Sequence, residues 1–365
     1  MKKAIIHDWL DLYGGAERIL TAISEVYDFD YYYAYVNKMS DADLKRAFAG
    51  KKVIVEDSKF LRPVRPFFRY LMPIFPFIVK SFNKQTKSNK VDLVLSSSWV
   101  LSKGYRIGNE IHICYMHSRN FKYVWDEAYL YFRGPFKALS FLKKPLQKFD
   151  IKSAQVPDHL ITNSKFVQSW VKEKYNREST VIYPPVEVDD FYISDQKEDY
   201  YITVGRIVKC KRFEIIVKAF KENGKQLIIV GDGPARKNLE KTASQNIHFV
   251  GYKTKEQLKG LLAKANAFVF AAEEDFGIAI VEALAAGLPV IAYKGGASEE
   301  LINSKTGVLY DHQNHEELNY AIESYCIKKD MFDSEYIRGT ALKFSKARFK
   351  EEISNYINRV SKSTN

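Results

Sequence analysis

The sequence predicts an α/β fold made of two Rossmann-like, doubly wound domains. A chain of 365 residues is longer than one ordinary domain and suits two of similar size. Short apolar runs alternate with segments of helical periodicity along most of the chain. Glycine-containing turns follow several of the apolar runs, as they do at the ligand-binding edge of parallel sheets.

Composition favours a globular protein in a reducing compartment. Hydrophobic residues make up 46% of the chain, and no uninterrupted apolar stretch is long enough to span a bilayer. The opening residues, MKKAIIHDWL, have too few apolar residues for a signal peptide. Cys114, Cys210 and Cys326 are isolated, which argues against a disulfide framework or a zinc site. We therefore expect a cytoplasmic location and no zinc site.

The positive charge is concentrated in the first half of the chain. The net charge is +12, and residues 1–190 hold 30 Lys and Arg against 21 Asp and Glu. Nucleic acid, an anionic membrane or a diphosphate-bearing substrate would each attract such a surface. We find no helix-turn-helix, RNP, KH or zinc-finger pattern, and therefore expect no nucleic-acid partner.

The N-terminal domain begins with a strand, a glycine pair and a helix. Residues 3–6 form the expected strand, and Gly14-Gly15 precedes a helix that ends near residue 26. Such a pair permits close approach of a phosphate to the backbone, or simply a tight loop that packs helix on sheet. Further strands are expected at residues 31–35, 53–55, 91–96, 111–116, 159–163 and 181–186.

Residues 58–91 have an unusual composition. They contain eight basic residues, including Arg62, Arg65 and Arg69, and no acidic one. Aromatic and aliphatic residues lie between the basic ones, and four prolines divide the segment. This mixture is typical of a segment at an anionic membrane surface. The alternative is a packed helical hairpin whose basic side chains are only solvated.

Polar candidates also follow the strands of this domain. His117 comes directly after the strand at 111–116, where it could bind a sugar or organise an acceptor. Asp126 could accept hydrogen bonds from acceptor hydroxyls, and Lys103 opens the connection before this strand. Structural roles for these side chains remain the alternative.

A polar, acidic stretch at residues 187–199 reads as the linker to the second domain. A strand at residues 202–206 ends in Gly205-Arg206, and Lys211 lies just beyond. Fixed cations at a strand end can neutralise the charge of a departing diphosphate. The turns at Gly231 and Gly233 and at Tyr252 follow the next two strands.

The most informative stretch is a strand, loop and helix within residues 267–301. An apolar run at 268–272 is followed by an acidic turn with Glu274 and Gly277, and a helix then starts at Ile278. A helix N-terminus after glycine binds anions, so the backbone of residues 277–279 is a candidate diphosphate site. Glu282 lies eight residues after Glu274, about 12 Å away at the helical rise, so that two carboxylates could hold the two ends of one ligand.

This stretch resembles the E-x7-E region of the retaining glycosyltransferase family 4, which has the GT-B fold. The resemblance implies that Glu274 binds hydroxyls of the donor sugar and that Glu282 binds the ribose. Asp275 stands where glycine is commoner in that family. The residues matching its donor site are Gly14, Gly15, Arg206, Lys211, Gly231, Gly233, Tyr252, Phe276, Gly277, Ile278 and Ala279.

The segment IHICYMHSRNFKYVWDEAY, residues 111–129, resembles the bacterial O-antigen and capsule mannosyltransferase branch of the family. Residues 119–123 depart from that pattern. The resemblance implies a GT-B fold whose two domains, residues 1–190 for the acceptor and 191–340 for the nucleotide sugar, face an interdomain cleft. The final helix, within residues 341–365, is then expected to pack back on the first domain.

The implied activity is retaining, metal-independent transfer of a hexose from a nucleotide-diphosphate sugar, without a cofactor. GDP-mannose is favoured over UDP-sugars as donor. The acceptor is expected to be a glycan or a polyprenyl-diphosphate-linked glycan in bacterial surface polysaccharide synthesis, and the protein is expected to lie at the inner face of the membrane. Two alternatives remain: a non-catalytic sugar-nucleotide-binding protein and a basic nucleic-acid-binding protein.

Overall fold

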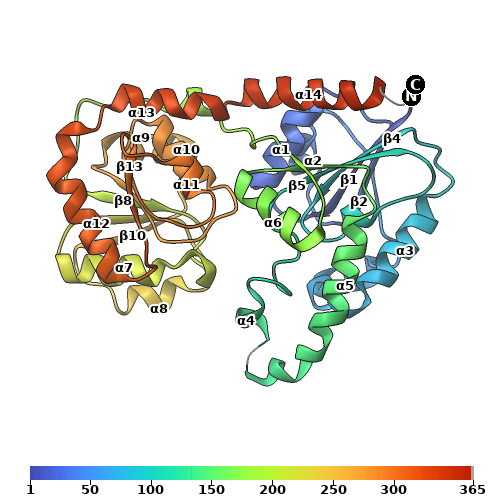
Figure 1. Cartoon of the computed structure of the whole chain (residues 1–365), viewed down its shortest axis with the longest axis horizontal. Helices are drawn as coiled ribbons and strands as arrows, with labels where there is room; N and C mark the ends of the chain where they lie inside the picture. The colour runs from blue at the N-terminus through green and yellow to red at the C-terminus, as the bar shows by residue number, and fades with distance from the viewer. Residues whose placement is uncertain (133, 363–365) are drawn as a thin grey trace. The chain divides into compact units, whose positions relative to one another are not determined.

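The computed structural model describes residues 1–132 and 134–362, without the side chains of residues 69, 70, 130, 131, 135 and 136. The chain divides into two compact units (Figure 1). Unit 1 comprises residues 1–185 together with the segment from residue 349 onward, and unit 2 comprises residues 186–348. Each unit has a parallel sheet with helices on both of its faces, which confirms the predicted α/β fold class.

Unit 1 contains a seven-stranded parallel sheet with the order β3-β2-β1-β4-β5-β6-β7. Its strands are β1 (Lys3–Leu10), β2 (Tyr31–Asn37), β3 (Val55–Asp57), β4 (Leu93–Ser98), β5 (Ile111–Met116), β6 (His159–Thr162) and β7 (Thr180–Val181). Its helices are α1 (Gly15–Ser24), α2 (Asp41–Ala47), α3 (Phe75–Thr86), α4 (Ala128–Tyr131), α5 (Lys143–Ala154), α6 (Lys165–Tyr175) and most of α14 (Lys346–Lys362). Short 3-10 turns at Arg62–Tyr70, Met72–Ile74, Ser102–Gly104 and Gly134–Leu142 complete it.

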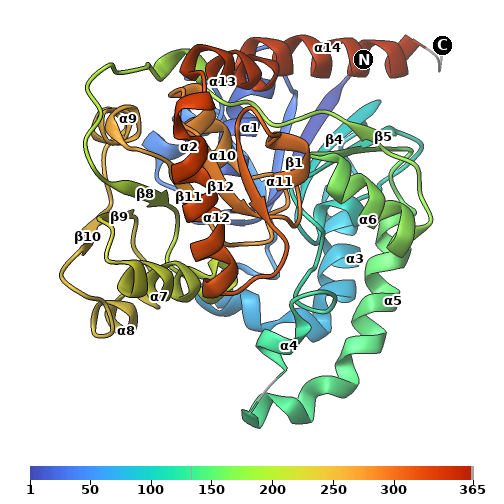
Figure 2. The same cartoon turned by 60° about the vertical axis from the view of Figure 1, so that its left-hand side comes forward.

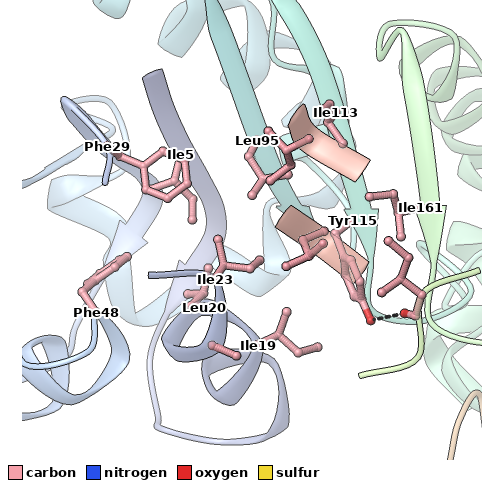
Figure 3. Packing of buried hydrophobic residues seen from close by; sticks show 14 of the residues in the cluster. Ile5, Ile19, Leu20, Ile23, Phe29, Phe48, Leu95, Ile113, Tyr115 and Ile161 are labelled. Atoms are coloured by element: carbon pink, nitrogen blue, oxygen red, sulfur yellow. Dashed lines mark hydrogen bonds between the residues drawn. The ribbon is translucent and has the colours of Figure 1, made fainter. Parts of the chain in front are cut away.

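The core of unit 1 follows the two-residue period of its strands. Ile5 and Leu95 face one side, where they pack with residues of α1, α2 and α14 (Figure 3). Their neighbours Ile6 and Val94 face the other side, toward α3 and the start of α5. On the first side the Tyr115 hydroxyl donates a hydrogen bond to the Ile182 carbonyl at 2.9 Å (Figure 3).

Unit 2 contains a six-stranded parallel sheet with the order β10-β9-β8-β11-β12-β13. Its strands are β8 (Tyr201–Val204), β9 (Leu227–Val230), β10 (Ile247–Gly251), β11 (Phe268–Phe270), β12 (Val290–Tyr293) and β13 (Gly307–Tyr310). Its helices are α7 (Phe213–Asn223), α8 (Arg236–Glu240), α9 (Lys255–Lys264), α10 (Ile278–Ala285), α11 (Ser298–Leu301), α12 (His315–Lys328) and α13 (Ser334–Ala341). Figure 2 shows α7 and α12 on the viewer's side of the strands, where apolar residues of both helices join the core.

Several boundaries differ from the sequence prediction by a few residues, and three of the differences have a clear physical reason. β1 continues to Leu10, because the residues after Ile6 still pair with β2. β7 is only two residues long, since Pro184 and Pro185 cannot donate to a ladder. The division between the units lies before Val186, because Val186, Val188 and Phe191 are buried and the Val186 N–H bonds the Phe344 carbonyl within unit 2.

Candidate active site

The sheet of unit 2 has a topological switch point between β8 and β11. These strands are neighbours, but the chain continues from β8 to β9 on one side and from β11 to β12 on the other. The loops after the two strands therefore diverge at the carboxyl edge of the sheet, which is where open α/β sheets bind ligands. Gly205 and Arg206 follow β8, and residues 271–277 follow β11.

An ion pair joins these two loops. The Lys211 ammonium contacts the Glu274 carboxylate, and the two side chains are 28% and 20% exposed. Lys211 ends a short 3-10 turn, Lys209–Lys211, and Arg212 then adopts a left-handed backbone before α7 begins. The pair is thus anchored by two elements of the sheet and remains partly open to solvent.

Arg206 lies on the same edge, and its side chain is exposed. Among the residues that the structure describes, no carboxylate forms an ion pair with it. The structure thus brings Lys211 and Glu274 together as predicted for one site, while the Arg206 guanidinium is left available for an anion. Its exposure makes it suitable for recognising phosphate in a bidentate way.

Helix α10 begins directly after the acidic loop. Gly277 precedes it with φ of +94°, a left-handed conformation that favours glycine. The capping residue Gly277 has no side chain to bond the first N–H groups of the helix, which suits them to an anion. Ile278 and Ala279 are half-buried, and the buried Phe276 ring packs on Phe344 with centroids 5.5 Å apart.

Glu282 lies in the second turn of α10 and is buried. Glu274 precedes the helix by four residues, so the helical rise does not give the distance between the two carboxylates. The predicted separation of about 12 Å applied the helical rise to all eight residues, of which only those from Ile278 onward are helical. The separation therefore stays a prediction, while Glu274 before α10 and Glu282 within it lie where the sequence predicted them.

Glycines hold the neighbouring loops close together. A Cβ on Gly231 would lie 2.0 Å from the Gly205 carbonyl oxygen, and one on Gly233 would lie 2.4 Å from the Ile207 carbonyl oxygen. A Cβ on Gly296 would lie 2.2 Å from the backbone carbonyl oxygen of Glu274. These glycines therefore have a packing role in the structure, whatever contacts they make with a ligand. Tyr252 is 85% exposed beside this edge.

In unit 1 the polar candidates gather at the carboxyl ends of β1, β4 and β5. The Ser97 hydroxyl lies 2.7 Å from Nδ1 of His7 and 2.5 Å from Nε2 of His117. Glu17, in the first turn of α1, accepts a hydrogen bond from the Gly14 N–H at 2.8 Å. Burial, and then the electrostatic effect of the neighbouring His7 imidazole, lower the pKa of His117 well below its usual value. His117 is thus a neutral imidazole at physiological pH.

Sequence reasoning missed three residues of this cluster: His7, Glu17 and Ser97. A signal was present, because His7 and Ser97 are polar residues within the largely apolar strands β1 and β4, and they are direct partners in the sheet. It also missed Asp8, whose carboxylate accepts hydrogen bonds from four backbone N–H groups of residues 99–102. Asp8 therefore fixes the loop that follows β4.

Lys103 does not have the acceptor or membrane role expected for it. It is fully buried, its ammonium lies 2.7 Å from Asp150, and it donates to the Val100 carbonyl at 2.6 Å. Asp150 also accepts hydrogen bonds from Trp125 and Tyr175. Lys103 is a structural residue because burial of its charge is tolerated only through this network.

Asp126 is partly exposed and holds two neighbours. It accepts a hydrogen bond from the Trp170 indole at 2.8 Å, and Arg119 lies 3.8 Å from it. Asp126 therefore has structural contacts in addition to the acceptor role predicted for it.

The basic segment at residues 58–91 folds into short helical pieces that leave several apolar side chains exposed. Arg62 and Arg65 both pair with the buried Asp57 carboxylate, so part of their charge is neutralised within unit 1. The side chain of Arg69 lies outside the described residues. Exposed apolar side chains in this segment are Phe60, Phe67, Ile74 and Phe77, and exposed lysines are Lys59, Lys80, Lys84, Lys87 and Lys90.

A second segment of the same kind was missed. Residues 128–149 contain five basic residues and no acidic one. Tyr129, Leu139 and Phe141 are exposed in it. Within the described residues, no helix is both long and apolar enough to cross a bilayer.

The fold is that of GT-B glycosyltransferases, with two Rossmann-like units. The Anabaena protein HepE, solved in complex with UDP-glucose, has a TM-score of 0.75 at 17% identity, covering 98% of this chain and 100% of HepE. More narrowly, residues 188–335 match the family model described as Glycosyl transferases group 1. That match lies within unit 2 and contains the Lys211–Glu274 pair.

Two relatives extend the comparison. The O-antigen chain mannosyltransferase RfbU of Salmonella typhimurium is 26% identical over 267 residues, which cover 68% of this chain and 74% of RfbU. An uncharacterized glycosyltransferase of Methanocaldococcus jannaschii is 28% identical over 171 residues, which cover 45% of this chain. The chain spans about half the length of that relative, 48%.

Proposed function

We propose that this protein is a retaining glycosyltransferase that transfers a hexose from a nucleotide-diphosphate sugar to a hydroxyl of a glycan or lipid-linked acceptor. The observation that carries the proposal is the Lys211–Glu274 pair at the switch point of unit 2, beside the uncapped start of α10. A cation, a carboxylate and free N–H groups at one sheet edge fit a ligand that has both a diphosphate and sugar hydroxyls.

The roles follow from charge. Arg206, Lys211 and the positive end of α10 stabilise the negative charge that develops on the departing diphosphate. Glu274 accepts hydrogen bonds from sugar hydroxyls, and its pairing with Lys211 orients the carboxylate. Glu282 is assigned to the ribose. These groups supply the positive field that the reaction needs, so we propose that transfer proceeds without a metal ion.

The chemical step is a same-face substitution. The bond from the anomeric carbon to the diphosphate oxygen breaks, and a bond from that carbon to the acceptor oxygen forms on the same face of the ring. The acceptor proton passes to the departing phosphate oxygen, which has become more basic. No protein nucleophile is required, and the anomeric configuration is retained.

Mannose is the favoured sugar because the relative RfbU is named a mannosyltransferase. GDP is favoured as the carrier on the resemblance described above, whereas HepE was solved with UDP-glucose. A surface polysaccharide intermediate is the favoured acceptor. Peripheral binding to the inner face of the membrane fits the exposed aromatic and basic side chains of the two segments at residues 58–91 and 128–149.

A thermal-shift panel of GDP, UDP, ADP and their sugars tests the donor site. We expect one nucleotide class to raise the Tm, and Arg206→Ala to abolish the shift while leaving the unliganded Tm unchanged, because Arg206 is exposed. Lys209→Ala, which removes an exposed lysine of the neighbouring 3-10 turn, is the matched control and should keep the shift. The absence of a shift with every nucleotide would overturn the donor assignment.

A transfer assay then distinguishes the alternatives. Nucleotide release that depends on an acceptor, that persists in EDTA and that gives a product with the donor's anomeric configuration is the expected result. A binding protein would give a shift without turnover. A nucleic-acid-binding protein would show salt-sensitive affinity for RNA or DNA and none for nucleotides.

A further inference from the structure

A chain of buried polar groups runs through unit 1 from α1 to the end of β5. Oε1 of Glu17 lies 3.4 Å from Nε2 of His7, and Nδ1 of His7 lies 2.7 Å from the Ser97 hydroxyl. The same hydroxyl lies 2.5 Å from Nε2 of His117. All four residues are buried.

Strand register explains why these residues meet. His7 and Ser97 are direct partners between β1 and β4, and they continue the inner face formed by Ile5 and Leu95. His117 follows Tyr115 on that face at the end of β5. Helix α1 covers this face, and its first turn supplies Glu17.

The hydrogens of the chain can be assigned by counting donors and acceptors. Ser97 has one hydroxyl hydrogen, so it donates to one imidazole and accepts from the other. An ionised carboxylate only accepts, and Glu17 lies where the dipole of α1 stabilises negative charge. Nε2 of His7 faces this carboxylate at 3.4 Å without the geometry of a hydrogen bond, and a hydrogen on that nitrogen, rather than a lone pair, is the arrangement that the negative charge favours. With a neutral His7, its Nδ1 accepts from Ser97, and Ser97 in turn accepts from Nε2–H of His117.

The reverse order would point a lone pair of Nε2 of His7 at the Glu17 carboxylate, or would need an additional proton on one of these two buried groups. We therefore assign the order that needs neither.

We propose that Glu17, His7 and Ser97 are positioning residues that hold His117 with Nε2 protonated and Nδ1 as a hydrogen-bond acceptor for a substrate hydroxyl. The role of the hydroxyl rests on the proposed function, whereas the tautomer does not. Nδ1 of His117 is buried and has no hydrogen-bond partner among the described residues, and an orphaned acceptor of this kind calls for one. The proposal therefore requires a local shift that uncovers this nitrogen for a hydroxyl.

The backbone and the ring of His117 both make contacts with neighbouring residues. The His117 N–H bonds the Ser98 carbonyl at 3.1 Å, and Asn163 donates to the His117 carbonyl at 2.6 Å. The Trp99 and Tyr115 rings each pack on the imidazole with centroids 5.4 Å apart. The two ring contacts restrict rotation of the imidazole, and the backbone bonds fix its position at the end of β5.

Side-chain ¹⁵N NMR of the full-length, histidine-labelled protein tests the tautomer directly, because a ring nitrogen with a hydrogen is distinguished from one with a lone pair. We expect His117 to show a protonated Nε2 and a bare Nδ1, with its signals assigned by their loss in His117→Gln. A hydrogen on Nδ1, or an average of both tautomers, would overturn the proposal.

Ser97→Ala should release the tautomer and lower kcat/KM about tenfold, the size of one neutral hydrogen bond. Ser97→Thr, which keeps the hydroxyl, should restore the ¹⁵N pattern. Ser96→Ala is the matched control: it removes a hydroxyl 2.8 Å from Nε2 of the buried His112 on the opposite face of the same strands. It should leave both kcat/KM and the His117 spectrum unchanged.

The two proposals fail separately. The predicted tautomer without turnover of any sugar nucleotide would support the positioning chain and sink the proposed function. Turnover with an unordered tautomer, or equal effects of Ser97→Ala and Ser96→Ala, would sink the positioning chain alone.

Discussion

The Lys211 ammonium and the Glu274 carboxylate form an ion pair across the loops that follow the adjacent strands β8 and β11. If both groups contact the donor, Lys211→Met and Glu274→Gln should each lower kcat/KM by about 10²–10³. Because the pair is partly exposed, the unfolding free energy should change by less than about 1 kcal/mol. Steady-state kinetics check the first expectation and chemical denaturation the second. Lys209→Ala is the control, and wild-type kinetics in Lys211→Met would contradict the assignment.

The close approach of Gly296 to Glu274 leads to a second prediction. Gly296 has φ of +68°, and a Cβ added to it would lie 2.2 Å from the backbone carbonyl oxygen of Glu274. Gly224 has nearly the same φ, +71°, but open space around its Cβ position. Gly224→Ala should cost about 1 kcal/mol from backbone strain alone, whereas Gly296→Ala should cost about 3 kcal/mol or more and weaken nucleotide binding. Thermal denaturation with and without nucleotide measures both. Equal costs would show that the loops can separate freely.

Burial of His112 makes the stability of unit 1 depend on pH. Burial, and then the charge of Arg106, lower the pKa of His112 to about 3. The folded state therefore keeps His112 neutral where the unfolded chain would protonate it, so its contribution is complete above pH 6.5 and is lost as the pH falls toward 3. Between pH 6.5 and pH 5 the loss should be about 1–2 kcal/mol.

The four tryptophans of the chain all lie in unit 1, so their fluorescence during urea unfolding reports on this unit. In the His112→Asn variant, the free energy of unfolding should fall less between pH 6.5 and pH 5 than in the wild type. In the His312→Asn variant, which changes an exposed histidine, it should fall as much as in the wild type. An identical pH dependence in wild type and His112→Asn would contradict the prediction.

The buried Lys103–Asp150 pair predicts a strong stability effect without a catalytic one. Lys103→Ala leaves the Asp150 charge buried without its cation and should cost about 3–5 kcal/mol, measured by the same fluorescence. Lys148→Ala, at an exposed position of α5, should change stability by less than about 0.5 kcal/mol. A Lys103→Ala variant that is stable but inactive would instead point to a functional lysine.

Membrane binding should depend on exposed aromatic residues more than on the arginines that pair with Asp57. Phe67 and Phe77 are 64% and 55% exposed, so the double change to serine should weaken co-sedimentation with anionic vesicles without unfolding unit 1. Ile327→Ser removes an exposed apolar side chain from α12 of unit 2 and is the control. Binding that is absent in the wild type, or unchanged in the double variant, would contradict peripheral attachment.

Local patterns predicted most of the fold. The buried strands β9, β12 and β13 match their apolar runs, because parallel strands covered on both faces leave a continuous apolar signal. The two-unit architecture followed from chain length and alternation. The short β7 and the extension of β1 depend on pairing with neighbouring strands, which a single run of residues does not encode.

The candidate site, like the fold, could be predicted from the sequence only in part. Glu274 and Lys211 were predictable because each follows an apolar strand, and adjacent strand ends meet in a parallel sheet. The burial of Lys103 was not predictable, because it depends on pairing with Asp150, which lies 47 positions away along the chain on α5. The His7–Ser97–His117 cluster likewise depends on a register between three strands that composition does not reveal.

The placement of α14 in unit 1 has a consequence for biosynthesis. Phe349, Ile353 and Ile357 form part of the core beside β1, β4 and β5, yet they follow all of unit 2 in the sequence. On the ribosome, the sheet of unit 1 must therefore wait with one apolar face incomplete until unit 2 has been synthesised. Unit 1 is thus synthesised first but completed last. A truncated product ending at residue 348 would expose that face to chaperones and to aggregation.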